Sequence, residues 1–418
     1  MGRSGRSVHY AWAIVVGGTL TTFAALGLGR FALGMLLPAM SADLGLGYAR
    51  MGWVGTANFV GYLISVLASG VVAARIGPRR MVVAALAVAG LSLVALSRAR
   101  SLEAVLVLYF LTGLGSGAAN VPVMSLVAAW FGSRSRGRAA GFIVSGSGFA
   151  ILLSGWLIPL LNRQHGAGGW RASWFALALI VLAVAVIDAI VLRDRPADKG
   201  LEPLGGPAAA FEPPAHHPHG IRGVLRRGAL WYLGLLYFLF GFTYVIAATF
   251  MVTSLVRDRG FPESVAGTFW SAVGALSLLS GPIFGTLSDR IGRRGGLAIV
   301  FGLQALAYAL FASGLPGWSL ALAVGCYGVT VWSVPSIMTA VAADLAGPRN
   351  AAAAFGFITF IFGLGQMAGP VVAGVLAERS GHFASSFALS AALAALAAGL
   401  ALLLRVGHRS GADRPGRD

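Results

Sequence analysis

The sequence predicts an all-α membrane protein with twelve transmembrane helices, arranged as two pseudo-symmetric six-helix bundles. Of its 418 residues, 57% are hydrophobic and 11% are charged, with a mean hydropathy of +0.81. A soluble domain carries about 25% charged residues. The apolar residues form long runs without the alternation of membrane β-strands. In addition, a short basic glycine turn occurs twice, once in each half of the chain.

Twelve apolar runs are long enough to be transmembrane helices, each of which needs about 20 residues. Six of them precede a polar stretch and six follow it. Their approximate bounds are 11–37, 51–73, 81–97, 104–130, 139–161, 172–192, 229–256, 264–287, 297–313, 318–343, 351–377 and 383–404. The first run is too long for the core of a signal peptide, so we expect it to remain as a helix.

The polar stretch divides the chain into domains. We expect an N-terminal bundle over 1–192, a cytoplasmic linker over 193–228, a C-terminal bundle over 229–405 and a tail over 406–418. The linker is rich in proline and charge, which is typical of a mobile segment. Its three histidines, His216, His217 and His219, have no acidic or cysteine partner at ligand spacing. We therefore expect neither a metal site nor a cofactor.

The net charge of +17 follows membrane topology. With the N-terminus placed inside, the predicted cytoplasmic segments hold 22 of the 31 Lys and Arg residues. This positive-inside bias predicts that both termini face the cytoplasm, and it argues against nucleic-acid binding. The one cysteine, Cys326, permits no disulfide within the chain.

The repeated turn indicates a duplicated architecture. Arg75-Ile76-Gly77 recurs 215 positions later as Arg290-Ile291-Gly292, and other glycine and arginine matches share this offset. Repeats with the same topology are related by an axis along the membrane normal, and their substrate sites lie near the midplane between the halves. The copies differ at one position, where Asp289 in the second corresponds to Ala74 in the first.

These motifs resemble those of the major facilitator superfamily. The segment 285–294 is similar to the superfamily's loop between helices 8 and 9, and 130–141 is similar to monocarboxylate and oxalate/formate carriers. The segments 27–31 and 362–370 resemble the bacterial YbfB/YjiJ-like branch most. The resemblance implies a membrane transporter, with helices 1, 2, 4, 5, 7, 8, 10 and 11 lining its cavity.

Arg30 is the main candidate for substrate binding. It is the only basic residue inside an apolar run, and it should lie roughly 12 Å from the outer end of its helix. An arginine near a helix centre costs about 2.5–3.5 kcal/mol to insert. Because no carboxylate lies at mid-membrane depth, Arg30 could bind an anionic substrate through its planar guanidinium. The alternative is a structural arginine that donates to carbonyl groups of neighbouring helices.

Uncharged polar and aromatic residues complete the predicted cavity wall. For the amides the alternative is a helix–helix hydrogen bond, and for the aromatic residues it is packing. The candidates on the cavity-lining helices are Asn58, Tyr62, Asn120, Tyr237, Tyr244, Trp270, Tyr327, Ser333 and Gln366.

A gate is predicted at the repeated turns. The resemblance implies that Asp289 approaches the positive N-terminal end of the fifth helix, near Arg138. Arg75, Arg290 and Arg293 belong to the same predicted gate. The mirror contact lacks its acid, so the gate should be asymmetric. The alternative is a local pair between Asp289 and Arg293.

The sequence thus predicts a monomeric secondary active or facilitative transporter that moves a small organic anion, such as a monocarboxylate, by alternating access. No nucleophile–base pair or metal cluster suggests an enzyme. Protons remain an open co-substrate, because symport, uniport and anion exchange all fit. The alternatives are efflux of apolar or cationic compounds, a non-transporting membrane sensor, and, more weakly, a lipid flippase.

Overall fold

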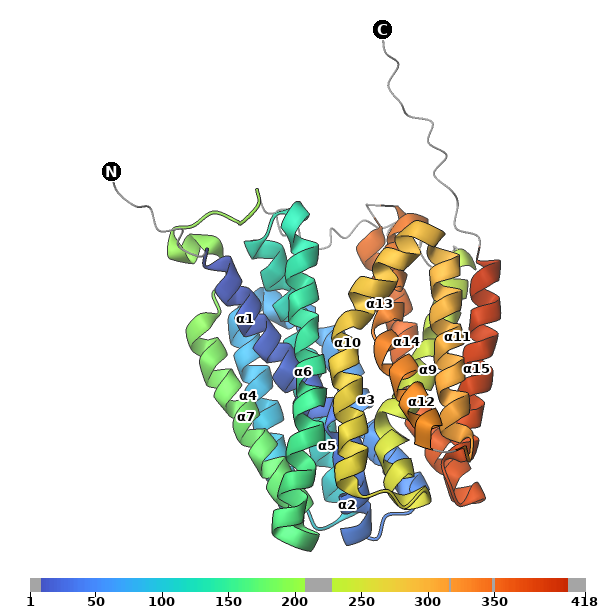
Figure 1. The fold of residues 1–418 in the computed structure, drawn as a ribbon. Coiled ribbons are helices and arrows are strands. Elements are labelled where there is room, and N and C mark those ends of the chain that lie inside the picture. Colours follow the sequence, from blue (N-terminus) through green and yellow to red (C-terminus); the bar gives the residue numbers. More distant parts are fainter. Residues whose placement is uncertain (1–8, 207–227, 316, 348–349, 405–418) are drawn as a thin grey trace, which may run out of the picture.

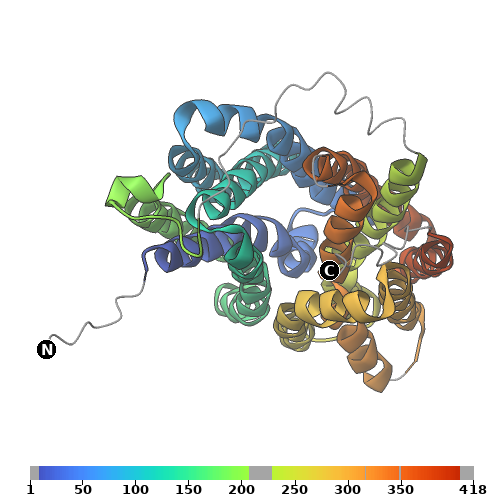
Figure 2. The ribbon, with the colours of Figure 1, turned by 90° about the horizontal axis from the view of Figure 1, so that it is seen from above.

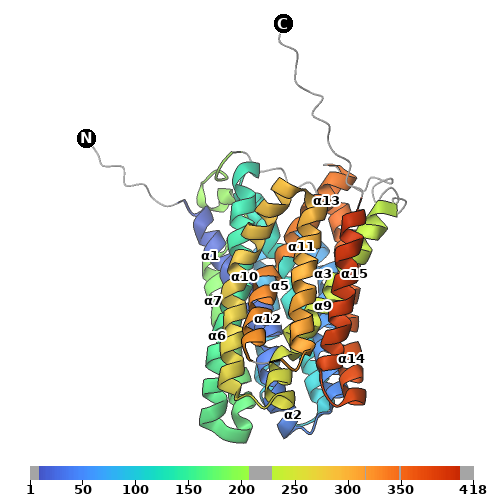
Figure 3. The ribbon, with the colours of Figure 1, turned by 45° about the vertical axis from the view of Figure 1, so that its right-hand side comes forward.

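Long helices that run between two opposite ends make up the protein (Figure 1). The computed structural model describes residues 9–206, 228–315, 317–347 and 350–404. The start of α1 (Ala11–Thr22) and the end of α15 (Ala384–Leu403) lie at one end of the molecule, here called the terminal end (Figure 3). The opposite end is the distal end. The predicted tail and the three linker histidines fall outside the described residues.

The N-terminal half starts with a helix in three parts. After α1 come a π-helical segment, η1 (Phe23–Phe31), and α2 (Leu33–Asp43). This helix ends later than the predicted residue 37, because Pro38 lies inside α2 without ending it. Membrane helices tolerate such prolines when neighbouring helices satisfy the freed backbone groups. The remaining helices are α3 (Tyr48–Ile76), α4 (Pro78–Leu96), α5 (Leu102–Trp130), α6 (Ser133–His165) and α7 (Gly169–Val191).

The C-terminal half contains one break that the sequence did not predict. Its helices are α9 (Gly228–Thr253) with the π-helical η4 (Ser254–Asp258), α10 (Glu263–Ile291), α11 (Arg293–Ala312), α12 (Gly317–Thr330), α13 (Ser333–Ala346), α14 (Ala351–Ser380) and α15. The predicted run 318–343 is therefore two helices. Pro335 explains the break, since it has no N–H to donate to the carbonyl of Val331.

The two copies of the glycine turn have the same backbone geometry. Gly77 ends α3 with φ 92° and ψ 142°, and Gly292 ends α10 with φ 90° and ψ 151°. Only glycine adopts a positive φ of this kind without strain. The repeat seen in the sequence is thus also a structural repeat.

Eleven candidate membrane spans occur in the described ranges. One of them, Ser135–Val191, has 57 residues and contains both α6 and α7, joined by the short turn η2 (Gly166–Gly168). Large apolar side chains point outward, among them Trp156, which is 63% exposed. Extended exposed apolar surface of this kind is typical of contact with a membrane.

α9 is the exception to this outward-facing pattern. In its most hydrophobic window 89% of the residues are buried, whereas the share is 28% for α3. α9 packs against α14 and α15 of its own half and against α2 of the other. It is therefore enclosed by protein over most of its length.

The halves lie side by side and contact each other mainly through two helix pairs, α6 with α10 and α3 with α14 (Figure 2). Near the distal end these helices approach backbone to backbone. A Cβ atom added to Gly267 would lie 2.2 Å from the carbonyl oxygen of Gly155, and one added to Gly52 would lie 2.4 Å from that of Pro370. Near the terminal end, a Cβ at Gly285 would meet no atom within 4 Å.

Hydrogen bonds between the halves gather at the same distal end. The Tyr48 hydroxyl donates to Asp258 at 3.0 Å. The backbone N–H of Ala49 donates to Glu378 at 3.2 Å. A third bond, 2.6 Å long, runs from the Asn162 amide to Glu263 on α10. In each case the N-terminal half supplies the donor and the C-terminal half supplies the carboxylate. These bonds hold the two halves together at the distal end.

The first part of the predicted linker is packed against the helices. The Trp130 indole donates to the carbonyl of Arg193 at 2.8 Å. Leu204 exchanges backbone hydrogen bonds with Trp130 and Gly132. Composition alone suggested a mobile segment here, but these bonds fix residues 193–206 beside the junction of α5 and α6.

Candidate functional site

Arg30 lies at the end of a π-helical segment. In η1 the hydrogen bonds span five residues, as in the bond from the Ala32 N–H to the Gly27 carbonyl, 3.2 Å long. The Arg30 carbonyl instead accepts a 2.9 Å bond from the Tyr109 hydroxyl of α5. Segments of π-helix often mark functional sites. Because α2 extends to Asp43, Arg30 lies about 20 Å from the end of its helix, deeper than the sequence suggested.

The Arg30 side chain is buried against aromatic rings and has unpaired donors. Only 7% of the residue is exposed. Its Cζ atom lies 4.0 Å from the centroid of the Phe59 ring and 4.4 Å from that of Tyr62. Its Nε and Nη2 atoms are buried without a hydrogen-bond partner. In the described part of the chain, no carboxylate forms an ion pair with it.

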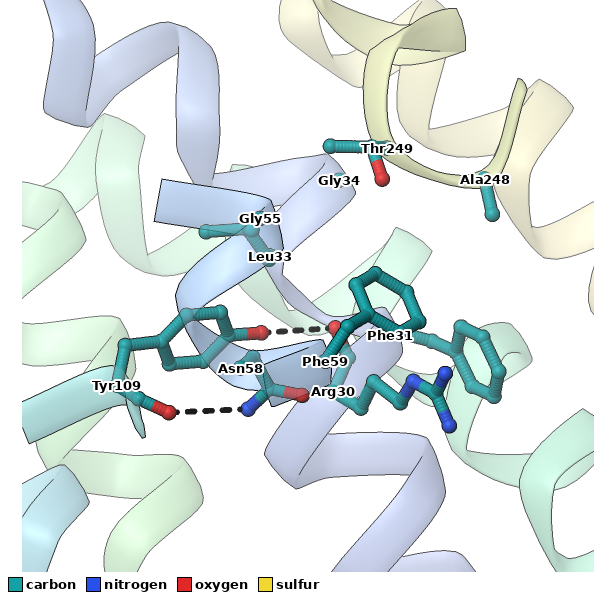
Figure 4. A pocket seen from close by; sticks show the side chains of 10 residues that line it. All are labelled: Arg30, Phe31, Leu33, Gly34, Gly55, Asn58, Phe59, Tyr109, Ala248 and Thr249. Atoms are coloured by element: carbon teal, nitrogen blue, oxygen red, sulfur yellow. Dashed lines mark hydrogen bonds between the residues drawn. The ribbon is translucent and has the colours of Figure 1, made fainter. Parts of the chain in front are cut away.

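The guanidinium borders a small pocket between the halves (Figure 4). The N-terminal half contributes Arg30, Asn58 and Tyr109, and the C-terminal half contributes Ala248 and Thr249. Figure 4 shows the guanidinium beside the phenyl rings, while Asn58 and Tyr109 are joined by a hydrogen bond. The pocket thus combines one cation with apolar and uncharged polar walls.

The predicted amides of the N-terminal half support neighbouring groups. The Asn58 side chain donates to the backbone carbonyl of Tyr109 at 3.2 Å, which is the helix–helix bond considered as the alternative. Its Oδ1 atom is buried and unpaired. Asn120 donates to the Tyr62 hydroxyl at 3.1 Å. That bond helps to hold Tyr62 beneath the Arg30 guanidinium.

In the C-terminal half the predicted residues form an aromatic stack around Tyr244. Its hydroxyl accepts a hydrogen bond from the Gln366 amide. Its backbone carbonyl accepts a 3.0 Å bond from the Tyr327 hydroxyl. The Tyr244 ring stacks on Phe240 at 4.8 Å, and Tyr237 stacks on Phe362 at 4.3 Å. Tyr244 and Gln366 are therefore joined directly, and these contacts link α9 to α14 and α12.

Two other predicted residues have partners outside the Arg30 pocket. The Trp270 indole donates to the Ser154 hydroxyl at 3.2 Å and so joins α10 to α6. Ser333 shares a 2.7 Å hydrogen bond with Ser280 at the start of α13. The structure therefore places Trp270 at the interface between the halves and Ser333 at the helix break.

Aromatic residues that were not predicted connect the two halves. The Phe31 and Trp332 rings are 5.3 Å apart, and Trp332 lies 6.1 Å from Tyr244. Phe59 lies against Arg30, and Phe362 stacks on Tyr244. Pro335 was the available signal for Trp332, since a proline in an apolar run indicates a possible helix break.

The predicted gate residues lie at the terminal end, and most of them are exposed. Arg75, Arg138 and Arg290 are exposed. Asp289 forms an ion pair with Arg293 of its own half, which is the local pair considered as the alternative.

An acid from elsewhere in the chain reaches each glycine turn. Arg293 also lies 3.6 Å from Asp344 of α13. In the first turn, where Ala74 replaces the acid, Asp194 accepts a 2.7 Å hydrogen bond from the backbone N–H of Arg79. Both turns are therefore held by carboxylates in this conformation.

The buried carboxylate that lies deepest in the N-terminal half is separate from this pocket. Asp188 of α7 is fully buried and accepts a 2.6 Å hydrogen bond from the Thr21 hydroxyl of α1. Its Oδ1 atom has no partner. Thr21 precedes Arg30 by nine residues, which is roughly 13 Å along a helix. Asp188 thus does not neutralise Arg30.

A bundle of apolar helices with a central cation between two repeated halves defines a membrane transporter rather than an enzyme. The chain belongs to the major facilitator superfamily family described as "Uncharacterised MFS-type transporter YbfB", whose model matches residues 22–402. The resemblance found in the sequence is thereby confirmed.

Curated relatives are similar over most of the chain. The probable sulfoacetate transporter SauU of Cupriavidus necator is 25% identical over 381 residues, covering 86% of this chain and 85% of that protein. The hexuronate transporter of Bacillus subtilis is 24% identical, covering 86% of each chain. The 4-hydroxybenzoate transporter PcaK of Pseudomonas aeruginosa is 28% identical over 60% of each.

Solved structures share the fold. A bacterial homologue of the human lysosomal transporter Spinster, in an inward-facing and unoccupied conformation, has a TM-score of 0.77 at 16% identity, covering 95% of this chain and 97% of that one. The nucleoside transporter NupG, as its D323A mutant, has a TM-score of 0.76 at 14% identity, covering 95% and 100%. At these identities the likeness concerns the fold alone.

Proposed function

We propose that this protein transports a small organic anion, a carboxylate, across a bacterial cytoplasmic membrane. The observation that carries the proposal is the buried Arg30 guanidinium with two unpaired nitrogen atoms. A buried charge without a partner is strongly unfavourable, and an anionic ligand would remove that cost. Arginine also presents a fork of donors that matches a carboxylate. The relatives named for sulfoacetate, hexuronate and 4-hydroxybenzoate support an organic anion.

The residues proposed to contact the anion come from both halves. Arg30 binds the charged group, and Tyr62, Tyr244 and Gln366 line the remaining wall. The other candidates have supporting roles in this proposal, because each already has a partner within the protein. Side-chain hydrogen bonds join Asn58, Asn120, Trp270, Tyr327 and Ser333 to neighbouring groups, and the Tyr237 ring stacks on Phe362.

Transport proceeds by alternating access in this proposal. The closed distal contacts and the unfilled space beside Gly285 favour a conformation in which the terminal end is open. With the terminal end in the cytoplasm, this conformation faces inward. Twelve membrane crossings fit best, because the 57-residue span would be about 85 Å long as one helix, against a hydrocarbon core of about 30 Å.

The gate at the terminal end would form in the opposite conformation. There Asp289 would leave its local partner and approach the start of α6, where the helix dipole is positive. Arg138 lies on that first part of α6, and Arg75 and Arg290 flank the two turns. Because the first turn has Ala74 in place of the acid, only one side of the gate would have this contact.

A thermal-shift screen followed by transport assays tests the function. Purified protein is heated with a panel of sulfoacetate, glucuronate, gallate, 4-hydroxybenzoate and simple monocarboxylates at two pH values. A ligand at about 100 times its Kd stabilises the native state by about 2.7 kcal/mol. A hit is then tested for uptake into proteoliposomes.

Arg30→Gln should abolish both the thermal shift and the uptake, because it removes the charge while keeping a similar side-chain length. Arg98→Gln is the matched control, since Arg98 is exposed between α4 and α5. Wild-type uptake by Arg30→Gln would overturn the assignment of Arg30. If no anion in a broad panel bound the wild-type protein, the proposed substrate class would be wrong.

A further inference from the structure

Two irregular helix segments face each other across the halves. In the N-terminal half the π-helical η1 ends at Phe31, and in the C-terminal half α12 and α13 are separated at Val331 and Trp332. The Phe31 and Trp332 rings meet at 5.3 Å. In transporters, interrupted helices near the middle of the membrane supply groups that bind substrate. Phe31 also lines the Arg30 pocket, so the helix break at Trp332 is close to that pocket.

Trp332 carries a donor that the protein does not use. Its indole Nε1 is buried and has no hydrogen-bond partner. Four other indoles do have a partner, since Trp130, Trp170, Trp174 and Trp270 donate to Arg193, Asp43, Met40 and Ser154 respectively. Buried donors without a partner are rare in native proteins. The unpaired indole N–H therefore points to an acceptor that arrives with a ligand.

The helix break holds Trp332 in place. Its backbone N–H donates to the Ser280 hydroxyl at 3.0 Å, and the same hydroxyl shares a 2.7 Å bond with Ser333. The Trp332 ring also lies 6.1 Å from Tyr244. Because its backbone and ring are both fixed by neighbours, the indole N–H is preorganised for binding.

The Arg30 guanidinium and the Trp332 indole are both close to one phenyl ring. The Arg30 Cζ atom is 5.7 Å from the centroid of the Phe31 ring, and the centroid of the Trp332 ring is 5.3 Å from the same centroid. The Arg30 Cζ atom and the centre of the Trp332 ring are therefore at most about 11 Å apart, which is within the reach of one small molecule. One donor is a cation from the N-terminal half, and the other is a neutral N–H from the C-terminal half.

We propose that the Trp332 indole N–H is a second binding group of the transport site and takes an oxygen acceptor of the anion. The proposal rests on the transport function above and narrows the substrate class. The substrate is a short anion with a second oxygen acceptor, such as a hydroxyl, carbonyl or sulfonate oxygen, beyond the group that Arg30 binds. Such an anion would bridge the two halves, so that binding favours their approach around it.

Pairs of anions that differ by the second acceptor test this proposal. Affinities of purified protein are measured by calorimetry for 4-hydroxybenzoate against benzoate, and for sulfoacetate against acetate. Trp332→Phe keeps a large ring but removes the N–H. It should weaken binding of the preferred acceptor-bearing anion about tenfold, the effect of one hydrogen bond. Binding of its partner without the acceptor should stay the same.

A matched control and Arg30→Gln separate the possible outcomes. Trp130→Phe removes an indole N–H that is bonded inside the protein, and it should leave anion affinity unchanged. Equal affinity of wild type and Trp332→Phe for the acceptor-bearing anion, with binding lost in Arg30→Gln, would overturn the role of Trp332 alone. Failure of wild type to bind any anion of the broad panel described above would overturn the proposed function and this inference with it.

Discussion

Replacing Gly267 by alanine should open the distal end of the protein. The added methyl group would lie 2.2 Å from the carbonyl oxygen of Gly155 and 2.8 Å from Cγ of Pro159. The first contact is with backbone, so the α6–α10 pair must separate to relieve it. Overpacking of this kind costs about 1–3 kcal/mol. A cost of that size, confined to the closed distal end, would raise the population of the distal-open conformation about 5- to 150-fold.

A cysteine reporter measures this shift. Thr249 is 5% exposed and lies in the contact between the halves, so Thr249→Cys is introduced together with Cys326→Ser. A membrane-impermeant maleimide added from the distal side should label the reporter faster when Gly267→Ala is present. Gly285→Ala is the control, because a methyl group there meets no atom within 4 Å. An unchanged labelling rate, or an equal rise in the control, would refute the reasoning.

Three further substitutions probe other parts of the structure. Asp289→Asn should shift the population toward the terminal-open conformation by about 0.3–2 kcal/mol, and unchanged labelling of a cysteine at the terminal end would contradict it. Thr21→Val leaves the buried Asp188 carboxylate without its hydrogen-bond donor. The free energy of unfolding should fall by about 1–3 kcal/mol, measured as a lower Tm in detergent. Thr21→Ser keeps the hydroxyl and should have a Tm close to that of the wild type. Tyr48→Phe removes the bond to Asp258 and should weaken distal closure by about 1 kcal/mol, seen as faster labelling of the same distal reporter.

The helical membrane class was predictable because it depends on bulk properties of the chain. Runs of about 20 apolar residues must form helices in lipid, where each backbone group needs an internal partner. The glycine turns were also predictable from the repeated Arg-Ile-Gly sequence. In both copies the glycine, Gly77 or Gly292, adopts a positive φ. The predicted end of the first helix at residue 37 was wrong, because Pro38 lies inside α2 and does not end it.

The central site could be predicted only in part. Arg30 stood out because a charge in an apolar run is costly wherever it points. Trp332 did not stand out, because the sequence around an aromatic residue in an apolar run is the same whether its side chain packs or binds a ligand. Its unpaired N–H appears only once the helix break and the neighbours of the indole are known. Gln366 was a predicted site residue, but its bond to Tyr244 could not be predicted, because it depends on how α14 and α9 pack.

The burial of α9 has a consequence for how the chain assembles. Because this helix has a mean hydropathy of 2.0, it is apolar enough to insert as a membrane span, so its insertion does not depend on its later neighbours. A substitution that prevents its packing would therefore leave it in the bilayer, exposed to lipid instead of to α14 and α15. Such a variant would reach the membrane at normal levels and fail afterwards, as an inserted but unassembled chain open to membrane proteases.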